Sequence, residues 1–248
     1  MHTIEEILQE LDRIMADAVQ CNNYLCIFGY VYWRTTQRIQ QGIQEGVFED
    51  NARMEQFDIA FAKRYIDAYW QYKNAETPTQ SWFTCFDAKK QSLTIMQHVL
   101  MGMNAHINLD LGIVAGTYEL PGGLESLKND FRKVNEILAS LTDEMQARVS
   151  RTSQLLTWLD RVGGNKDEAI ANLGIKISRE YAWHIASQIA QRPPEERTLY
   201  IQQTDKEIAH FSQLILQPPG KVLKYILRIF SWFEEKDVVK IMADLRQE

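Results

Sequence analysis

Cysteine, proline and glycine are scarce in this chain, and their scarcity narrows the class of protein. Only 3 of the 248 residues are cysteine, and none belongs to a CxxC pair. A disulfide-stapled secreted scaffold and a CxxC-based metal site are therefore not expected, and the odd count fits reduced thiols in a cytoplasmic protein. The 6 prolines and 12 glycines form no low-complexity segment and no linker that would mark a domain boundary.

Long apolar runs and an excess of basic residues are also missing. The most apolar stretches contain Arg, Lys or His, so no transmembrane helix is expected. The N-terminus, MHTIEEILQELDRIM, reads as an acidic amphipathic helix and lacks the features of a signal peptide. The net charge of -6 argues against binding of a nucleic acid. Neither a glycine-rich phosphate loop nor a nucleophile elbow occurs.

Helical periodicity runs along almost the whole chain. We expect helices over residues 3–20, 23–45, 51–74, 88–116, 123–140, 142–162, 166–191, 194–216 and 220–246. Pro and Gly lie at the breaks, as at Thr77-Pro78, Gly163-Gly164 and Pro193-Pro194. The connections are short, which predicts one all-α domain over residues 1–248, a multi-helix bundle. Helix 88–116 is apolar all round and is expected to be buried at the centre.

The segment from His98 to Asp110, HVLMGMNAHINLD, places polar side chains in this apolar helix. His106 and Asp110 are one turn apart and share a face, which His98 borders. Asn104 and Asn108 form a second such pair on the opposite side. A buried helix with this many polar groups indicates a prearranged polar site, because each group needs a partner.

Two interpretations of His106 and Asp110 remain open. The pair can serve as metal ligands or as an acid/base pair. Alternatively, Asp110 only orients His106, or each satisfies backbone groups of neighbouring helices. Small residues lie between the polar positions, and they allow a helix or a ligand to approach the backbone closely: Gly102, Ala105, Gly112 and Ala115.

The helix predicted over 51–74 supplies a second group of candidates. Asp50 resembles an N-cap, and Asp58 falls within an apolar stripe, where an aspartate is either paired or recruited to a site. Glu55 lies one turn before Asp58 and can join it, while Arg64 can meet an anionic group. The alternative is that Asp58 caps or bridges a neighbouring helix.

Three further features carry weaker signals. His184 and His210 each sit beside apolar residues and are more typical of core or boundary positions than of a site. The C-terminal helix places Lys221, Lys224 and Arg228 on one face against a broad apolar face. That pattern is typical of a last helix that docks on a bundle, and it also occurs in helices that contact a membrane surface.

Several segments together resemble a bacterial family described only as a domain of unknown function. They are YWRTT, FEDNARMEQFDIAFAKRYIDAYW, SWFTCFD and HVLMGMNAHINLDLGIVA, and the resemblance is strongest between Tyr30 and Ala115. It supplies no reaction. It implies that the candidate site residues coincide with the signature segments of the family: Asp58, Arg64, His98, Asn104, His106 and Asp110.

A more distant similarity is to the all-helical zinc-dependent phospholipase C and single-strand nuclease enzymes, where HxxxD pairs hold a zinc cluster. The resemblance implies five histidines for three zinc ions, but this chain has 5 histidines in all, one of them His2. A trinuclear cluster is therefore not expected, whereas a mono- or dinuclear site stays open. The adjacent His-Asp of HD-type phosphohydrolases is absent.

These observations lead to three hypotheses. The first is a metal-dependent hydrolase, of the phosphoester type, with zinc, manganese or iron held by His98, His106, Asp110 and Asp58. In it, His106 and Asp110 are the catalytic pair, and Asn104, Asn108, Arg64 and Glu55 assist. The second is a non-catalytic helical module that binds a small apolar or amphipathic ligand or a cofactor. The third is an interaction protein whose buried polar groups fix helix register.

Overall fold

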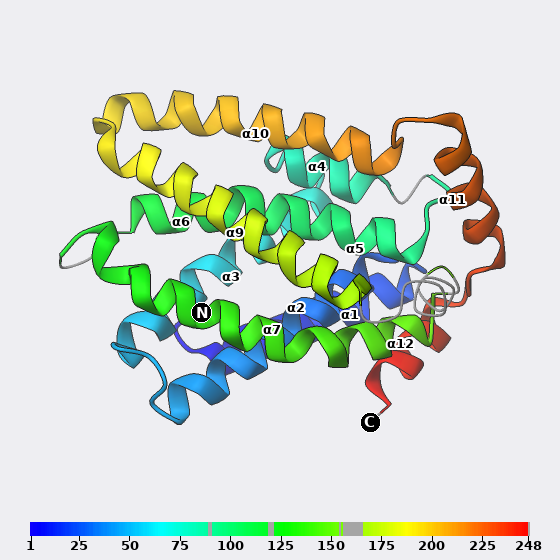
Figure 1. The fold of residues 1–248 in the computed structure, drawn as a ribbon, viewed down its shortest axis with the longest axis horizontal. Helices are drawn as coiled ribbons and strands as arrows, with labels where there is room; N and C mark the ends of the chain where they lie inside the picture. The colour runs from blue at the N-terminus through cyan, green and yellow to red at the C-terminus, as the bar shows by residue number, and fades with distance from the viewer. Residues whose placement is uncertain (89–90, 119–121, 154, 156–165, 248) are drawn as a thin grey trace.

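The computed structural model describes residues 1–88, 91–118, 122–153, 155 and 166–247. Within them the chain is helical and contains no strand, so the predicted all-α fold is confirmed. The helices pack side by side, and α11 (Lys221–Phe233) lies at one end of the molecule (Figure 1). None of the helices in the described part of the chain has both the length and the apolar character that crossing a bilayer requires.

Three helices form the N-terminal part: α1 (Ile4–Gln20), α2 (Leu25–Gln44) and α3 (Asn51–Lys73). Polar side chains cap two of them. Thr3 accepts a hydrogen bond from the backbone N–H of Glu6, and Asp50 accepts one from the backbone N–H of Arg53. The predicted N-cap at Asp50 is thus confirmed. Aliphatic side chains of α1, including Ile7, Leu11 and Ile14, are fully buried against α2 and α3.

The predicted helix 88–116 begins later than expected. Residues 89–90 lie outside the described part, and α5 (Ile95–Met103) begins after a capping box formed by Thr94 and Gln97. Before it comes α4 (Gln80–Asp87), a short helix that the periodicity did not predict. The central helix is buried, as expected, since His98, Met101, Ala105 and Leu109 are almost fully enclosed.

A π-helix, η2 (Asn104–Asp110), interrupts this central helix before it resumes as α6 (Leu111–Thr117). A π-helix bonds residue i to residue i+5 and is rare, and it occurs often at functional sites. Here it coincides with the polar segment that contains His106 and Asp110. The polar candidates therefore lie on an unusual stretch of backbone.

The remaining described elements are η3 (Leu124–Leu127), α7 (Lys128–Ser150), α9 (Lys166–Gln191), α10 (Pro194–Leu216), α11 and α12 (Val238–Arg246). Two of the predicted helix boundaries in this part of the chain differ from the structure. The predicted break near residue 141 is wrong, because α7 continues through it. The predicted helix 220–246 is divided, because Asp237 caps a new helix by accepting from the N–H groups of Val239 and Lys240. The predicted end at Gly163-Gly164 lies outside the described residues.

The small residues of the central helix permit close helix contacts, as predicted. A Cβ atom added at Gly116 would lie 2.7 Å from the carbonyl oxygen of Ala186 on α9, and one at Gly112 would lie 2.7 Å from Cγ2 of Ile185. One at Gly102 would overlap the Phe28 ring of α2. The absence of side chains at these positions lets α9 and α2 contact the backbone of the central helix.

Candidate functional site

Asp110 is fully buried and accepts hydrogen bonds from three side chains on different elements. Arg64 of α3 donates from Nε to Oδ1 at 3.2 Å, and Trp82 of α4 donates from Nε1 to Oδ2 at 2.7 Å. The third partner is His106, with Nδ1 at 3.1 Å from Oδ2. A buried carboxylate is tolerated only when it is paired and hydrogen-bonded, and these donors meet that need.

The ring of His106 is enclosed by aromatic side chains. It stacks on Phe61 with the ring centroids 3.8 Å apart and the planes within 7°. Tyr32 meets it edge to face at 4.4 Å, and the rings of Tyr65 and Trp82 lie at 6.0 Å. These rings come from α2, α3 and α4, so the histidine lies where three helices meet the π-helix.

His106 is held in a defined tautomer. Because a carboxylate only accepts, Nδ1 carries the proton that is shared with Asp110. Burial lowers the pKa of His106 below its usual value, although the hydrogen bond that His106 donates to Asp110 opposes this effect. The imidazole is therefore neutral near pH 7, and its Nε2 presents a lone pair. That atom is buried and has no hydrogen-bond partner.

Asp58 is buried beside the same region and is also incompletely paired. Its Oδ2 atom has no hydrogen-bond partner, and burial raises its pKa to about 7. Tyr32 connects the two residues. Its ring contacts His106, and the pKa of its hydroxyl group is raised well above the usual value, first by burial and then by the charge of Asp58. Thr36, one turn along α2, acts in the opposite direction on this pKa. No hydrogen bond of normal geometry joins the Tyr32 and Thr36 hydroxyl groups, and both oxygens are unpaired.

His98 lies away from the pair that it was predicted to join. Its ring stacks on Tyr24 at the start of α2, with centroids 5.0 Å apart and planes within 8°. Burial lowers its pKa to about 4, and the charge of Lys236 adds to this effect. The predicted grouping of His98 with His106 and Asp110 around one metal ion is not seen in the described residues, because the two histidines pack in separate aromatic environments.

The two asparagines hold the π-helix against α10. Asn104 donates from Nδ2 to the carbonyl oxygen of Ile208 at 3.0 Å and to Oγ of Ser212 at 2.9 Å. Asn108 donates to Oδ1 of Asn104 at 2.7 Å. The predicted asparagine pair is therefore confirmed as a pair, and it joins two helices. Glu55 is half-buried on α3, one turn from Asp58, with no hydrogen bond to it in the described part of the chain.

Several residues of this site were missed at the level of sequence. Trp82, Phe61, Tyr32 and Thr36 come from segments that were noted only as signatures or as apolar stripes. The one local signal is the i,i+4 spacing of Tyr32 and Thr36 in YWRTT, which places two hydroxyl groups on one helical face. The tryptophan gave no signal, because its indole N–H finds Asp110 only through tertiary packing.

The hydrogen bonds to Asp110 make this carboxylate a less suitable metal ligand. Among the described residues, no three His, Cys, Asp or Glu side chains are grouped so that they could hold a metal ion. Three protein donors already occupy the Asp110 oxygens. Among the predicted metal ligands in the described part of the chain, His106 Nε2 and Asp58 Oδ2 are buried without a hydrogen-bond partner.

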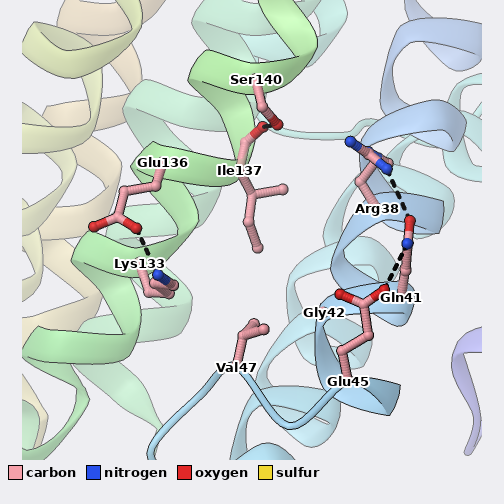
Figure 2. A pocket seen from close by; sticks show the side chains of 9 residues that line it. All are labelled: Arg38, Gln41, Gly42, Glu45, Val47, Lys133, Glu136, Ile137 and Ser140. Atoms are coloured by element: carbon pink, nitrogen blue, oxygen red, sulfur yellow. Dashed lines mark hydrogen bonds and ion pairs between the residues drawn. The ribbon is translucent and has the colours of Figure 1, made fainter.

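A surface pocket lies elsewhere, between α2 and α7, and contains none of the predicted site residues (Figure 2). Its charged side chains pair along their own helices. Arg38 donates to Gln41, Gln41 donates to Glu45, and Lys133 pairs with Glu136 at 2.6 Å. A pocket whose polar groups are paired in this way offers less to a ligand than the unpaired atoms near His106.

Fold and site thus define an all-α protein with a buried His–Asp pair on a π-helix. The chain belongs to a family of unknown function, DUF5995, whose model matches residues 4–218. The resemblance inferred from the sequence motifs is thereby confirmed. No curated protein and no solved structure matches the chain.

Proposed function

We propose that the protein is a hydrolase that binds a small molecule beside His106 and uses His106 as a general base. The carrying observation is that Nδ1 of His106 is held by Asp110 while Nε2 is buried and unpaired. An aspartate that orients a neutral imidazole in this way prepares the opposite nitrogen to take a proton from water or from a hydroxyl group.

The surroundings of His106 support a bound ligand. Unpaired buried polar atoms cost about 1–3 kcal/mol each. Tyr32, Thr36, Asp58 and His106 contribute four of them next to aromatic rings. A small molecule with an apolar body and a polar end would satisfy these atoms. His106 is only 2% exposed, so such a molecule reaches Nε2 after side chains of α3 move aside, among them Phe61 and the part-exposed Arg64.

The geometry favours metal-free chemistry over the metal-dependent version of this hydrolase. His98 is remote from the pair, and the oxygens of Asp110 are engaged by protein donors. In a metal-dependent form, His106 Nε2 and Asp58 are the candidate ligands, and the ion would activate a water molecule. The free thiols of Cys21, Cys26 and Cys85 support the cytoplasmic location that the composition predicts.

The test is hydrolysis of para-nitrophenyl acetate and para-nitrophenyl phosphate by untagged protein, with EDTA or with added Zn²⁺ or Mn²⁺. We expect His106→Gln to lower the rate by about 10²–10⁴-fold. His184→Gln, at an exposed histidine, should leave it unchanged. The rate should rise with pH through a midpoint below 6.5, because burial lowers the pKa of His106 and only the neutral form accepts a proton.

The second candidate function is that of a non-catalytic binding module. The unpaired hydroxyl groups of Tyr32 and Thr36 favour it, because a bound ligand could supply their hydrogen-bond partners and neither group has a role in the proposed proton transfer. In that case neither ester is hydrolysed, but a panel of small phosphates, carboxylates and amines contains compounds that raise the melting temperature of the wild-type protein. These shifts should disappear in Asp58→Asn. If there is neither hydrolysis nor a ligand-induced shift, and His106→Gln lowers only stability, both proposals fail and the network is structural.

A further inference from the structure

Helix α11 presents a large apolar surface to solvent. Val222, Tyr225, Trp232 and Phe233 are each between 61% and 74% exposed. Ser231 is the one side chain of this helix that is buried. Contiguous exposed apolar surface of this kind marks a site of contact with a partner or a membrane.

The four most exposed apolar residues of α11 follow one another around the helix. At about 100° per residue, Trp232, Tyr225, Val222 and Phe233 fall within a single arc on one side of the helix. Ser231 lies on the opposite side, towards the protein. The apolar arc therefore points away from the bundle. Helix α11 itself lies at one end of the molecule (Figure 1).

Basic side chains border this arc. Lys221, Lys224 and Arg228 are exposed, and α11 contains no acidic residue, although the whole chain has a net charge of -6. The two aromatic residues nearest to them are Tyr225 and Trp232, and the Arg228 guanidinium lies 5.5 Å from the centre of the Trp232 ring. Aromatic rings between cations and an apolar face are typical of helices that lie in a membrane interface.

The C-terminal end of α11 is anchored to the bundle. Glu234 is buried, and it accepts hydrogen bonds from the backbone N–H of Ile95 and from Oγ of Ser153, both at 2.6 Å. The hydroxyl group of Tyr24 donates to the carbonyl oxygen of Glu235 at 3.3 Å. These contacts fix which face of α11 is turned inward, so the apolar face is displayed by a folded protein.

We infer that α11 docks the protein on the surface of a bilayer that contains anionic lipid. The apolar arc inserts at the level of the acyl chains, and the lysines and the arginine bind lipid phosphates. Charge selects this occupant. A second copy that used the same face would bring Lys221, Lys224 and Arg228 together with their own equivalents across a two-fold axis, which repels. The inference is independent of the function proposed for the His106 site.

The test is co-sedimentation of the full chain with vesicles of phosphatidylcholine, with or without phosphatidylglycerol. We expect binding to the anionic vesicles that weakens with added salt. Each of Lys221→Glu, Lys224→Glu and Arg228→Glu should weaken the binding by at least about fivefold. Val222→Ser combined with Phe233→Ser should abolish most of it. All five positions are exposed, so the variants should fold, which circular dichroism verifies.

Two matched variants serve as controls. Leu199→Ser removes an apolar side chain that is 60% exposed on α10, and Lys206→Glu reverses an exposed charge on the same helix. Both should bind vesicles like the wild-type protein. Lack of wild-type binding to anionic vesicles would overturn the inference, as would equal binding to neutral vesicles or equal losses in the controls. A dimer in sedimentation velocity that Val222→Ser and Phe233→Ser dissolve, without vesicle binding, would assign the face to a second copy instead.

Discussion

Asp58 is a buried carboxyl group whose ionisation lowers the free energy of unfolding of the protein. Burial raises its pKa from 3.8 to about 7, so the folded state holds the proton more tightly than the unfolded state does. The free energy of unfolding should therefore fall as the pH rises from about 4 to about 7, with a total contribution of at most about 4 kcal/mol. Residues that reduce stability in this way are typical of functional sites.

Asp58→Asn should remove this part of the pH dependence. The variant should be more stable than the wild-type protein at pH 8 and no more stable at pH 3, because the carboxyl group is then mostly protonated in both states. Urea unfolding at a series of pH values measures the difference. Asp67→Asn, at an exposed position on the same helix, is the control and should show no such gain. Equal pH profiles for Asp58→Asn and the wild-type protein would contradict the prediction.

His106 makes a separate prediction at the same scale. In ¹⁵N-labelled protein, we expect a neutral imidazole that is protonated at Nδ1 and that becomes charged with a midpoint below pH 6.5, because burial lowers its pKa. Heteronuclear NMR of the histidine rings measures this, with His106→Gln to assign the signal. A signal at pH 7 from a ring that is protonated at Nε2 only would rule out the proposed tautomer.

At the scale of single residues, the sequence was sufficient to predict contacts between side chains one turn apart on the same helix. The i,i+4 spacing was enough to pair His106 with Asp110, and Asn104 with Asn108. It could not show that Trp82 donates to Asp110, because the partner is 28 positions away and is brought in by packing alone. His98 failed to join the site for a related reason: its neighbour Tyr24 lies on another helix, whose register no local pattern reveals.

The contact between α6 and α9 depends on the absence of a side chain at Gly116. Gly116→Ala places a Cβ atom 2.7 Å from the backbone oxygen of Ala186, which cannot rotate away. We expect a loss of about 1–3 kcal/mol, because the helices must separate. Urea unfolding measures it.

Gly174→Ala is the matched control within α9. Nothing lies within 4 Å of a Cβ atom at that position, and alanine is the better helix former, so the variant should gain about 0.5–1 kcal/mol. A loss at Gly174 as large as that at Gly116 would show that the close contact with Ala186 does not determine the effect.

Element boundaries were predictable where a side chain ends the helix and uncertain elsewhere. Asp50 was identified because it precedes an apolar repeat, whereas the equivalent role of Asp237 was concealed because it ends a run of four charged residues that contains no proline or glycine. The break proposed near residue 141 had no proline or glycine to support it, and α7 runs through. The π-helix could not be foreseen, since its residues have ordinary helical propensities.

On the scale of the whole molecule, the C-terminal helix α12 lies outside the matched family region of 4–218 but belongs to the main hydrophobic core. Ile241 is fully buried, and Arg148 of α7 donates to the carbonyl oxygen of Leu245 at 3.0 Å. The fold therefore includes α12 as an integral part.

Ile241→Ala should lower the free energy of unfolding by about 2–5 kcal/mol, as expected for a large aliphatic residue that leaves a cavity. Val239→Ala, two residues away and 62% exposed, should change it by less than about 0.5 kcal/mol. Thermal and urea unfolding compare the two. If both variants are as stable as the wild-type protein, α12 is not part of the cooperative unit.

The π-helix has a consequence for how this chain can vary. Its hydrogen bonds span one residue more than those of an α-helix, so deletion of Ile107 would let the segment close as a regular helix. Because the deleted residue is the one that the wider turn accommodates, α6 would keep nearly the same rotation relative to α5. Gly112 and Gly116 would still face α9, whereas the spacing between His106 and Asp110 would shorten from four residues to three. Replacement of Ile107 by leucine keeps the count and should be tolerated. The extra residue of the π-helix therefore sets the spacing of the buried His106–Asp110 pair, and the contact of α6 with α9 does not depend on it.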